Sequence, residues 1–235
     1  MDKLKKIKVI AFDADDTLWV NEPYFRKAEE LFCDLMSKYM PAKTVLDELY
    51  KIEMQNMGLY GYGAKAFTLS LVEAALKFTN GAVSTSAIDE ILSIGREIID
   101  HPVEMLDNVV ELLGKLKNHN YRLLMVTKGD LLEQERKLVK SGLLPYFEHI
   151  EILSDKTEDN YKKLLRYLAV DPCEFMMIGN SLRSDILPVL KIGGQAVYVP
   201  YHTVWLHEMA EIEPSFKFYE IGQLGQLTQL LDISE

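Results

Sequence analysis

Residues 8–19 read KVIAFDADDTLW, and this stretch decides the fold. Its apolar run, Val9–Phe12, is short and partly β-branched, which is typical of a buried strand in a parallel sheet covered on both faces. The run ends at Asp13, and Asp15 and Asp16 follow at once. Carboxylates at the end of a buried strand are costly unless a cationic group lies beside them. Because ligands bind at the carboxyl edge of open α/β sheets, the stretch predicts a binding site there.

The composition is that of an ordinary globular protein, with 48% hydrophobic and 26% charged residues among 235. A formal net charge of −10 argues against general binding to nucleic acid or anionic membranes, although a local cationic pocket is compatible with it. Apolar runs are too short for a signal peptide or a membrane span. Cys33 and Cys173 lie far apart and are interpreted as reduced thiols. We expect a cytoplasmic protein, monomeric or homodimeric, without nucleic-acid or membrane partners.

Residues 20–101 show helical periodicity and almost no strand signal. Four helices are predicted, at residues 24–35, 46–57, 64–78 and 86–99. The last of them has Ser86 as its expected N-cap, with Asp89 three residues on. The stretch is therefore predicted to be a helical bundle inserted after the first strand.

Residues 102–200 alternate between strand-like and helical segments. Strands are predicted at 121–126, 149–153, 175–178 and 196–199, and helices at 109–118, 131–141, 159–168 and 184–192. This alternation indicates right-handed crossovers and an α/β fold in which helices cover both faces of a parallel sheet. We predict a core of residues 1–19 and 102–235 and an inserted helical domain of residues 20–101. A short helix at 224–231 is given no chemistry.

Polar residues follow four of the predicted strands. Because parallel strands bring their carboxyl ends to one edge, these side chains should converge. They are Asp13, Asp15, Thr127, Lys156, Asn180 and Asp185.

The order of these residues resembles that of the haloacid dehalogenase-like hydrolases. DADDTLW at 13–19 resembles their first motif, DxDxT/V, and VTKGD at 126–130 resembles the second. Lys156 stands where their third-motif lysine falls, and GNSLRSD at 179–185 resembles the fourth, acidic motif. The resemblance covers most of the chain. It implies a Rossmann-like core with a helical cap inserted between the first and second motifs, as in the phosphatase branch of the family.

Two aspartates carry the chemistry in this interpretation. The Asp13 carboxylate can attack phosphorus and form an aspartyl-phosphate, which divides one difficult displacement into two. The resemblance implies that Asp15 protonates the leaving oxygen and then activates water. Because a halide needs no proton, an acid at this position favours phosphate esters over carbon–halogen bonds. Asp16 is interpreted as a solvated neighbour.

Three further residues are candidates for binding the phosphoryl group. Thr127 offers a hydroxyl, and Lys156 offers a point charge that would neutralise the phosphoryl group and Asp13. Lys162 and Lys163 compete with Lys156 for this role. Lys128 stands where many relatives have Asn, and it either adds positive charge or points to solvent.

The same edge of the sheet is predicted to hold Mg²⁺, which prefers oxygen ligands. Asp13, the Asp15 carbonyl, Asn180 and Asp185 are the candidate ligands. The fourth motif commonly begins Gly-Asp, whereas this chain has Gly179-Asn180, so the direct ligand is left open between Asn180 and Asp185.

These predictions combine into a Mg²⁺-dependent phosphatase that acts on a small phosphorylated metabolite. The alternatives are a phosphomutase with the same nucleophile and a non-catalytic relative that binds metal or phosphate. The helical insertion would act as a lid, with hinges near residues 20–23 and 101–102. Residues 60–63 are its candidate substrate-facing loop.

Overall fold

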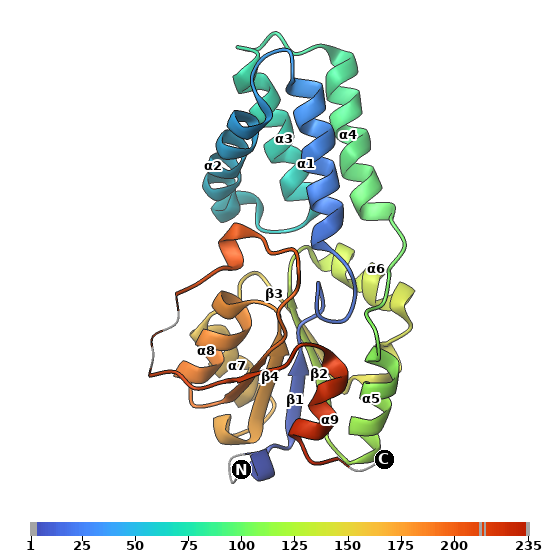
Figure 1. Cartoon of the computed structure of the whole chain (residues 1–235), viewed down its shortest axis with the longest axis vertical. Helices are drawn as coiled ribbons and strands as arrows, with labels where there is room; N and C mark the ends of the chain where they lie inside the picture. The colour runs from blue at the N-terminus through green and yellow to red at the C-terminus, as the bar shows by residue number, and fades with distance from the viewer. Residues whose placement is uncertain (1–3, 212, 214, 234–235) are drawn as a thin grey trace. The chain divides into compact units, whose positions relative to one another are not determined.

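A six-stranded parallel sheet forms the core of the chain in a computed structural model, which describes residues 4–211, 213 and 215–233. Its order is β3-β2-β1-β4-β5-β6, so β1 lies in the middle, beside β2 and β4 (Figure 1). The strands are β1 (Val9–Phe12), β2 (Arg122–Lys128), β3 (His149–Leu153), β4 (Phe175–Gly179), β5 (Gln195–Tyr198) and β6 (Tyr219–Glu220). The predicted α/β fold is confirmed.

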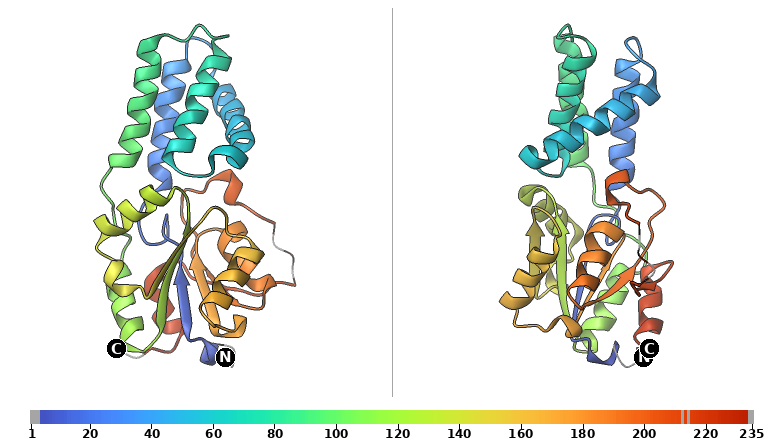
Figure 2. Two further views of the ribbon diagram at one scale, coloured as in Figure 1. Left: turned by 180° about the vertical axis from the view of Figure 1, so that it is seen from behind. Right: turned by 90° about the vertical axis from the view of Figure 1, so that its left-hand side faces the viewer.

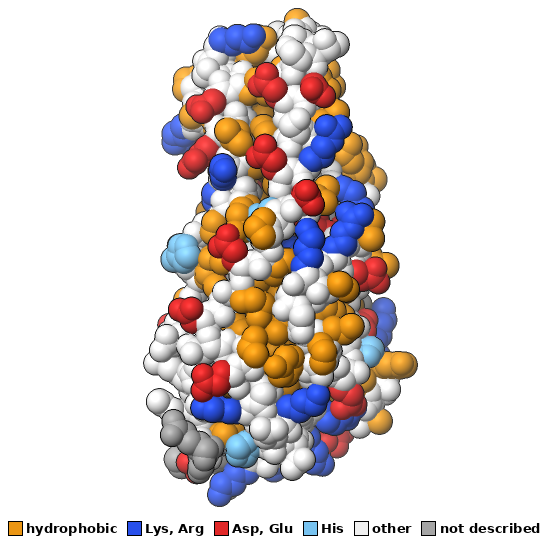
Figure 3. Space-filling view, turned by 90° about the vertical axis from the view of Figure 1, so that its right-hand side faces the viewer, with side chains coloured by type: hydrophobic (Ala, Val, Ile, Leu, Met, Phe, Trp, Pro, Cys, Tyr) orange, Lys and Arg blue, Asp and Glu red, His pale blue; other side chains and the backbone are white. Residues whose placement is uncertain are grey.

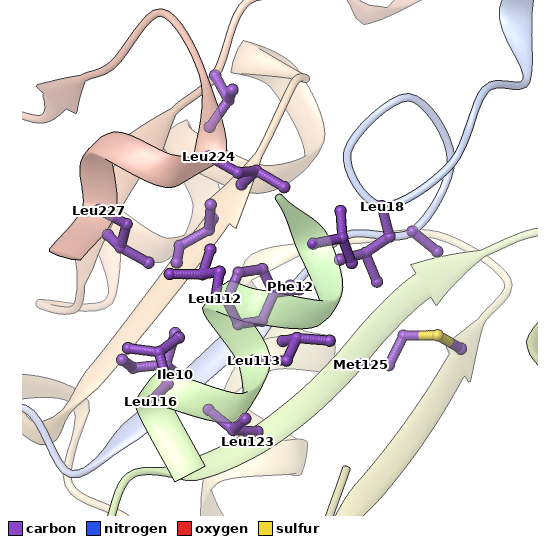
Figure 4. Close-up of a cluster of buried hydrophobic side chains, with 14 of the residues drawn as sticks. Ile10, Phe12, Leu18, Leu112, Leu113, Leu116, Leu123, Met125, Leu224 and Leu227 are labelled. Atoms are coloured by element: carbon purple, nitrogen blue, oxygen red, sulfur yellow. The ribbon is translucent and has the colours of Figure 1, made fainter. Parts of the chain in front are cut away.

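Helices cover both faces of this sheet (Figure 2). One face carries α5 (Val109–Asn118), α6 (Leu131–Ser141) and α9 (Leu227–Leu230), and the other carries α7 (Glu158–Tyr167) and α8 (Leu187–Lys191). Successive residues of β1 point to opposite faces, as the pleat requires. Ile10 and Phe12 pack with α5 and α9 (Figure 4), whereas Val9 and Ala11 pack with α7. All four are buried, so β1 is apolar throughout and anchors both layers.

The inserted helices form a bundle with its own hydrophobic core. They are α1 (Glu22–Met36), α2 (Ala42–Tyr60), α3 (Ala64–Phe78) and α4 (Thr85–Asp100). The core of the bundle is built from side chains such as Phe32, Leu49, Leu71 and Ile91, each no more than 1% exposed. The helical insertion between β1 and β2 is therefore present as expected.

Contacts divide the chain into two units. One comprises Met1–Glu22, Val103–Lys128 and Arg136–Glu235, and the other comprises Pro23–Pro102 and Gly129–Glu135. Residues 129–135 were expected in the core, yet they contact the helical unit. The Ala64 amide donates to Glu133 Oε2 at 2.9 Å, and Lys65 pairs with Asp130 at 2.7 Å. The boundaries of the two domains as folding units stay a prediction.

Three local features differ from the sequence-based expectation. The N-cap of α4 is Ser84, whose side chain accepts from the Ala87 amide, and not Ser86. The helix expected at 184–192 begins as a π-helical turn, Leu182–Ile186, before α8. The two-residue strand β6 was missed because so short a segment has no periodicity to detect.

On the face shown in Figure 3, acidic and basic side chains are interspersed, with hydrophobic side chains between them. None of the helices in the described part of the chain is both long and apolar enough to cross a membrane.

Candidate active site

Strand β1 delivers Asp13 to the carboxyl edge of the sheet. The Asp13 amide donates to the carbonyl of Ile178 on β4 at 2.8 Å, which places Asp13 beside the end of that strand. On the other side, β1 pairs with β2, which ends at Thr127 and Lys128. Asp13 and Thr127 are 7% and 1% exposed. The predicted convergence at one edge of the sheet is thus what the strand register produces.

The ammonium of Lys156 lies between two buried carboxylates. It donates to Asp13 Oδ1 and, at 2.7 Å, to Asp185 Oδ1. The other oxygen of Asp185 accepts from the Ser181 amide at 3.0 Å. Lys156 is 3% exposed, whereas its two competitors for this role, Lys162 and Lys163, are exposed on α7. Of the three lysines, Lys156 is therefore the one that lies beside Asp13, and its role toward a phosphoryl group stays a prediction.

Burial governs the ionisation of this trio. Burial raises the pKa of Asp13 above its ordinary value, although the Lys156 charge opposes the shift. The pKa of Asp185 is raised for the same reason and opposed by the same partner. Burial alone would lower the pKa of Lys156, but the charges of Asp13 and Asp185 outweigh it, and the pKa is raised. Lys156 is consequently cationic across the physiological range.

The side-chain amide of Asn180 faces two oxygen acceptors. One of its terminal atoms lies 3.1 Å from Asp13 Oδ2 and 3.2 Å from the Asp15 carbonyl oxygen. As the amide nitrogen, this atom donates to both acceptors. As the amide oxygen, it accepts from the Thr17 hydroxyl at 3.2 Å and lies beside two further oxygens, an arrangement that a bound cation would stabilise. Asn180 thus lies directly beside Asp13, whereas both oxygens of Asp185 are already engaged with Lys156 and Ser181.

Trp19 and Lys137 both donate to one carboxylate oxygen of Asp15. Its Oδ1 accepts from Trp19 Nε1 at 2.7 Å and from Lys137 Nζ at 2.8 Å. Lys137 also donates to the Asn21 side chain at 3.0 Å, which ties α6 to the loop after β1. Lys137 could not be identified from the sequence, because a lysine on an amphipathic helix has no signal that separates it from a solvated one.

The interpretation of Asp16 as a solvated neighbour is wrong. Asp16 is 6% exposed, and its carboxylate accepts from the amides of Asn21 and Glu22 at 2.8–3.1 Å. Its φ of 58° lies in the left-handed region, which aspartate tolerates better than most residues. Asp16 therefore fixes the loop that leaves β1, which is a structural role.

Lys128 does not point to solvent. Its ammonium donates to Ser184 Oγ at 2.9 Å and pairs with Glu208, a residue that no motif in the sequence indicates. Glu208 also accepts from the hydroxyls of Ser181 and Ser184. Burial opposes the ionisation of Glu208, but Lys128 and these hydroxyls hold its pKa at about 2. Glu208 is thus an anion at neutral pH.

Ion pairs gather at this edge. Among the described residues, four carboxylates pair here with three ammonium groups. The carboxylates are those of Asp13, Asp15, Asp185 and Glu208, and the ammonium groups are those of Lys128, Lys137 and Lys156. Among the described residues, no three His, Cys, Asp or Glu side chains form a group that could hold a metal by themselves. A cation here would have to use carbonyl or amide oxygens as well.

Gly179 leaves the space that Asp185 occupies. A Cβ at position 179 would lie 2.2 Å from Asp185 Oδ2 and 2.8 Å from Asp185 Cβ. The Gly179→Ala variant must therefore displace Asp185 from Lys156 and Ser181. We expect its free energy of unfolding, measured by chemical denaturation, to fall by about 3 kcal/mol.

The matched control is Gly114→Ala in α5, where no atom lies within 4 Å of the new Cβ. Because alanine is the better helix former, this variant should be more stable by about 0.5–1 kcal/mol. A Gly179→Ala protein as stable as the wild type would contradict the placement of Asp185.

Comparison with known proteins gives three related results. A family model for haloacid dehalogenase-like hydrolases matches residues 7–193. The solved structure of a haloacid dehalogenase-like family hydrolase from Xanthomonas campestris is 36% identical, covers 97% of this chain and 92% of that one, and has a TM-score of 0.86. A glyceraldehyde 3-phosphate phosphatase from Pyrococcus furiosus is 26% identical over 99% of this chain and 95% of the relative.

A fourth match shares the fold at lower identity. The structure of the putative HAD-hydrolase YfnB from Bacillus subtilis, which was solved bound to magnesium, is 18% identical and has a TM-score of 0.65. It covers 97% of this chain and 99% of that one.

Proposed function

The chain belongs to the haloacid dehalogenase-like hydrolases, and from that premise we propose that it is a Mg²⁺-dependent phosphatase acting on a small phosphorylated metabolite. One observation carries the proposal: Asp13 lies against the Lys156 ammonium at the carboxyl edge of the sheet, and a second acid, Asp15, follows two residues later. The full-length similarity to a phosphatase of a small phosphate ester supports this assignment.

In the proposed reaction, Asp13 attacks phosphorus and the bond to the leaving oxygen breaks, which gives an aspartyl-phosphate. Asp15 gives its proton to the leaving oxygen. It then takes a proton from the water that attacks phosphorus, so that phosphate is released and Asp13 is regenerated. Trp19 and Lys137, which hold Asp15 Oδ1, would keep this acid oriented through both steps.

The charge that develops on the phosphoryl oxygens needs fixed donors. Lys156 places a desolvated positive charge beside the Asp13 carboxylate, where the new bond forms. Thr127, the last residue but one of β2, lies at the same edge, and its hydroxyl would donate to a phosphoryl oxygen. Direct contact between Lys128 and the phosphoryl group stays a prediction, since the ammonium of Lys128 binds Glu208 and Ser184 in this structure.

The donor set also fits a hard cation. Asp13 Oδ2 and the Asp15 carbonyl oxygen lie 3.1 and 3.2 Å from one terminal atom of the Asn180 amide, so the three groups would offer adjacent oxygens to a cation when the amide turns its oxygen toward them. We assign Mg²⁺ to Asp13, Asp15 and Asn180, with Asp185 acting through Lys156 and Ser181. Bound there, Mg²⁺ would neutralise charge on the substrate phosphate. The lid function of the helical unit, with hinges near 20–23 and 101–102 and a substrate-facing loop at 60–63, stays a prediction.

A panel of metabolite phosphates tests this function. The purified protein should release inorganic phosphate from an aryl phosphate and, faster, from at least one small phosphorylated metabolite, and EDTA should abolish the release. Transfer of the phosphoryl group to a hexose phosphate, with no free phosphate formed, would identify a phosphomutase instead. Binding of Mg²⁺ without turnover of any ester would identify a non-catalytic relative.

A further inference from the structure

Glu208 lies in a segment that none of the sequence motifs includes. It ends the short turn Leu206–Glu208, which follows β5. Its side chain is only 13% exposed, as is typical of a carboxylate that is satisfied by partners rather than by water. One oxygen pairs with Lys128, and the other accepts from Ser181 Oγ and, at 2.7 Å, from Ser184 Oγ. Glu208 therefore joins the end of β2 to the turn after β4.

The two serines belong to the turn that carries the acidic end of the site. Ser181 Oγ caps this turn by accepting from the Ser184 amide at 2.9 Å. The Ser181 amide donates to Asp185, and Ser181 directly follows Asn180. The Ser184 carbonyl accepts from the buried Tyr161 hydroxyl at 3.1 Å. A displacement of this turn would move Asn180 and Asp185 together.

Lys128 makes the carboxylate of Glu208 necessary. The Lys128 side chain is 14% exposed, so its ammonium has lost most of its water. Without an anion beside it, that charge would be costly and would repel Lys156, which shares this edge of the sheet. Glu208 neutralises this charge and, in the same arrangement, accepts a hydrogen bond from the Ser184 hydroxyl.

We propose that Glu208 is a positioning residue for the phosphatase site: through Ser181 and Ser184 it holds the turn that presents Asn180 to Asp13 and Asp185 to Lys156. Lys128 and Glu208 act as one neutral pair in this role. The inference rests on the proposed function, because what the turn positions is the cation site and the ammonium that serve the nucleophile.

The test compares four proteins in Mg²⁺ affinity, measured by calorimetry, and in kcat and KM for an aryl phosphate. Partners that orient ligand residues are worth 10- to 100-fold in affinity or activity. We expect Glu208→Gln to weaken Mg²⁺ binding and to lower kcat by about 10-fold or more, with KM changed less than about 3-fold. Adding Lys128→Asn to Glu208→Gln removes the charge that Glu208 neutralises and should recover most of the lost Mg²⁺ affinity. The control, Glu211→Gln, changes an exposed glutamate of the same segment and should behave as the wild type.

A merely structural role would lower the melting temperature of Glu208→Gln without the split between kcat and KM and without recovery in the double variant. If Glu208→Gln does not fold, the Ser184→Ala variant tests the inference instead. It deletes one hydroxyl that donates to Glu208 and keeps the charges of Lys128 and Glu208. It should weaken Mg²⁺ binding by about 3-fold or more, and unchanged affinity would overturn the inference.

The two proposals fail in different ways. If the wild-type protein hydrolyses no phosphate ester, the proposed phosphatase function is refuted. The positioning role of Glu208 is then tested by the Mg²⁺ titration without any activity measurement. Equal Mg²⁺ affinity in the wild type and Glu208→Gln, or no Mg²⁺ binding by the wild type, overturns the positioning role.

Discussion

The Asp13→Asn variant is expected to lose phosphatase activity by a factor on the order of 10⁴ or more in kcat, because a carboxamide does not attack phosphorus. The fold should survive this change. Asparagine has the shape of aspartate, and Lys156 keeps the Asp185 carboxylate as its partner. Burial opposes the ionisation of Asp13. Replacing its carboxylate with a neutral amide therefore also removes part of the free-energy cost of burying that charge. Steady-state phosphate release at saturating substrate measures the loss, and circular dichroism reports the fold.

Asp16→Asn is the matched control, since it makes the same chemical change three residues further on. Asp16 accepts from the Asn21 and Glu22 amides, and asparagine keeps one oxygen that can do so. Its kcat should stay within about 10-fold of the wild type. An Asp13→Asn protein with comparable activity would remove Asp13 from the role of nucleophile.

The Lys156→Met variant is expected to be the most destabilising single substitution at this edge. Methionine fills the space but leaves Asp13 and Asp185 buried without the cation that they share. Removing one partner of a buried ion pair costs about 3–5 kcal/mol. Urea denaturation at neutral pH should show a loss of that size, together with loss of phosphate release.

This loss should depend on pH in a definite direction. Burial already raises the pKa of Asp13 and Asp185, and the substitution removes Lys156, the group that opposes that shift most strongly. The folded variant then binds protons at a pH at which the unfolded chain does not, so its deficit shrinks as the pH falls toward the ordinary aspartate value. Lys162→Met, which removes an exposed lysine of α7, should change stability by about 0.5 kcal/mol or less at every pH. A Lys156→Met protein as stable as that control would contradict the buried trio.

The parts of the fold that follow from local pattern were predictable. The run Val9–Phe12 is apolar at every position, and it is the central strand. Once the strands are parallel, the ends of β1, β2 and β4 must share an edge, so the proximity of Asp13 and Asn180 follows from topology. Helices α3, α5 and α6 have the expected bounds because their apolar residues recur at helical spacing.

What depends on the three-dimensional course of the backbone was not predictable. Glu208 binds Lys128, which lies 80 residues earlier, and the segment around it has no periodicity that would mark it. Asp16 looked solvated because nothing local shows that Asn21 and Glu22 turn back toward it. Ser84 and Ser86 are equally good caps by residue type, and the backbone selects Ser84.

The central claim is that the phosphoryl group passes through Asp13, and trapping the intermediate tests it most directly. The enzyme is mixed with the best substrate of the panel and quenched during turnover. Borohydride reduction then converts an aspartyl-phosphate to homoserine, which tandem mass spectrometry locates in the sequence. For the wild type, the account predicts homoserine at position 13 and at no other aspartate. For Asp13→Asn, it predicts no homoserine. Homoserine at another position, or unmodified Asp13 in an enzyme that is releasing phosphate, would contradict it.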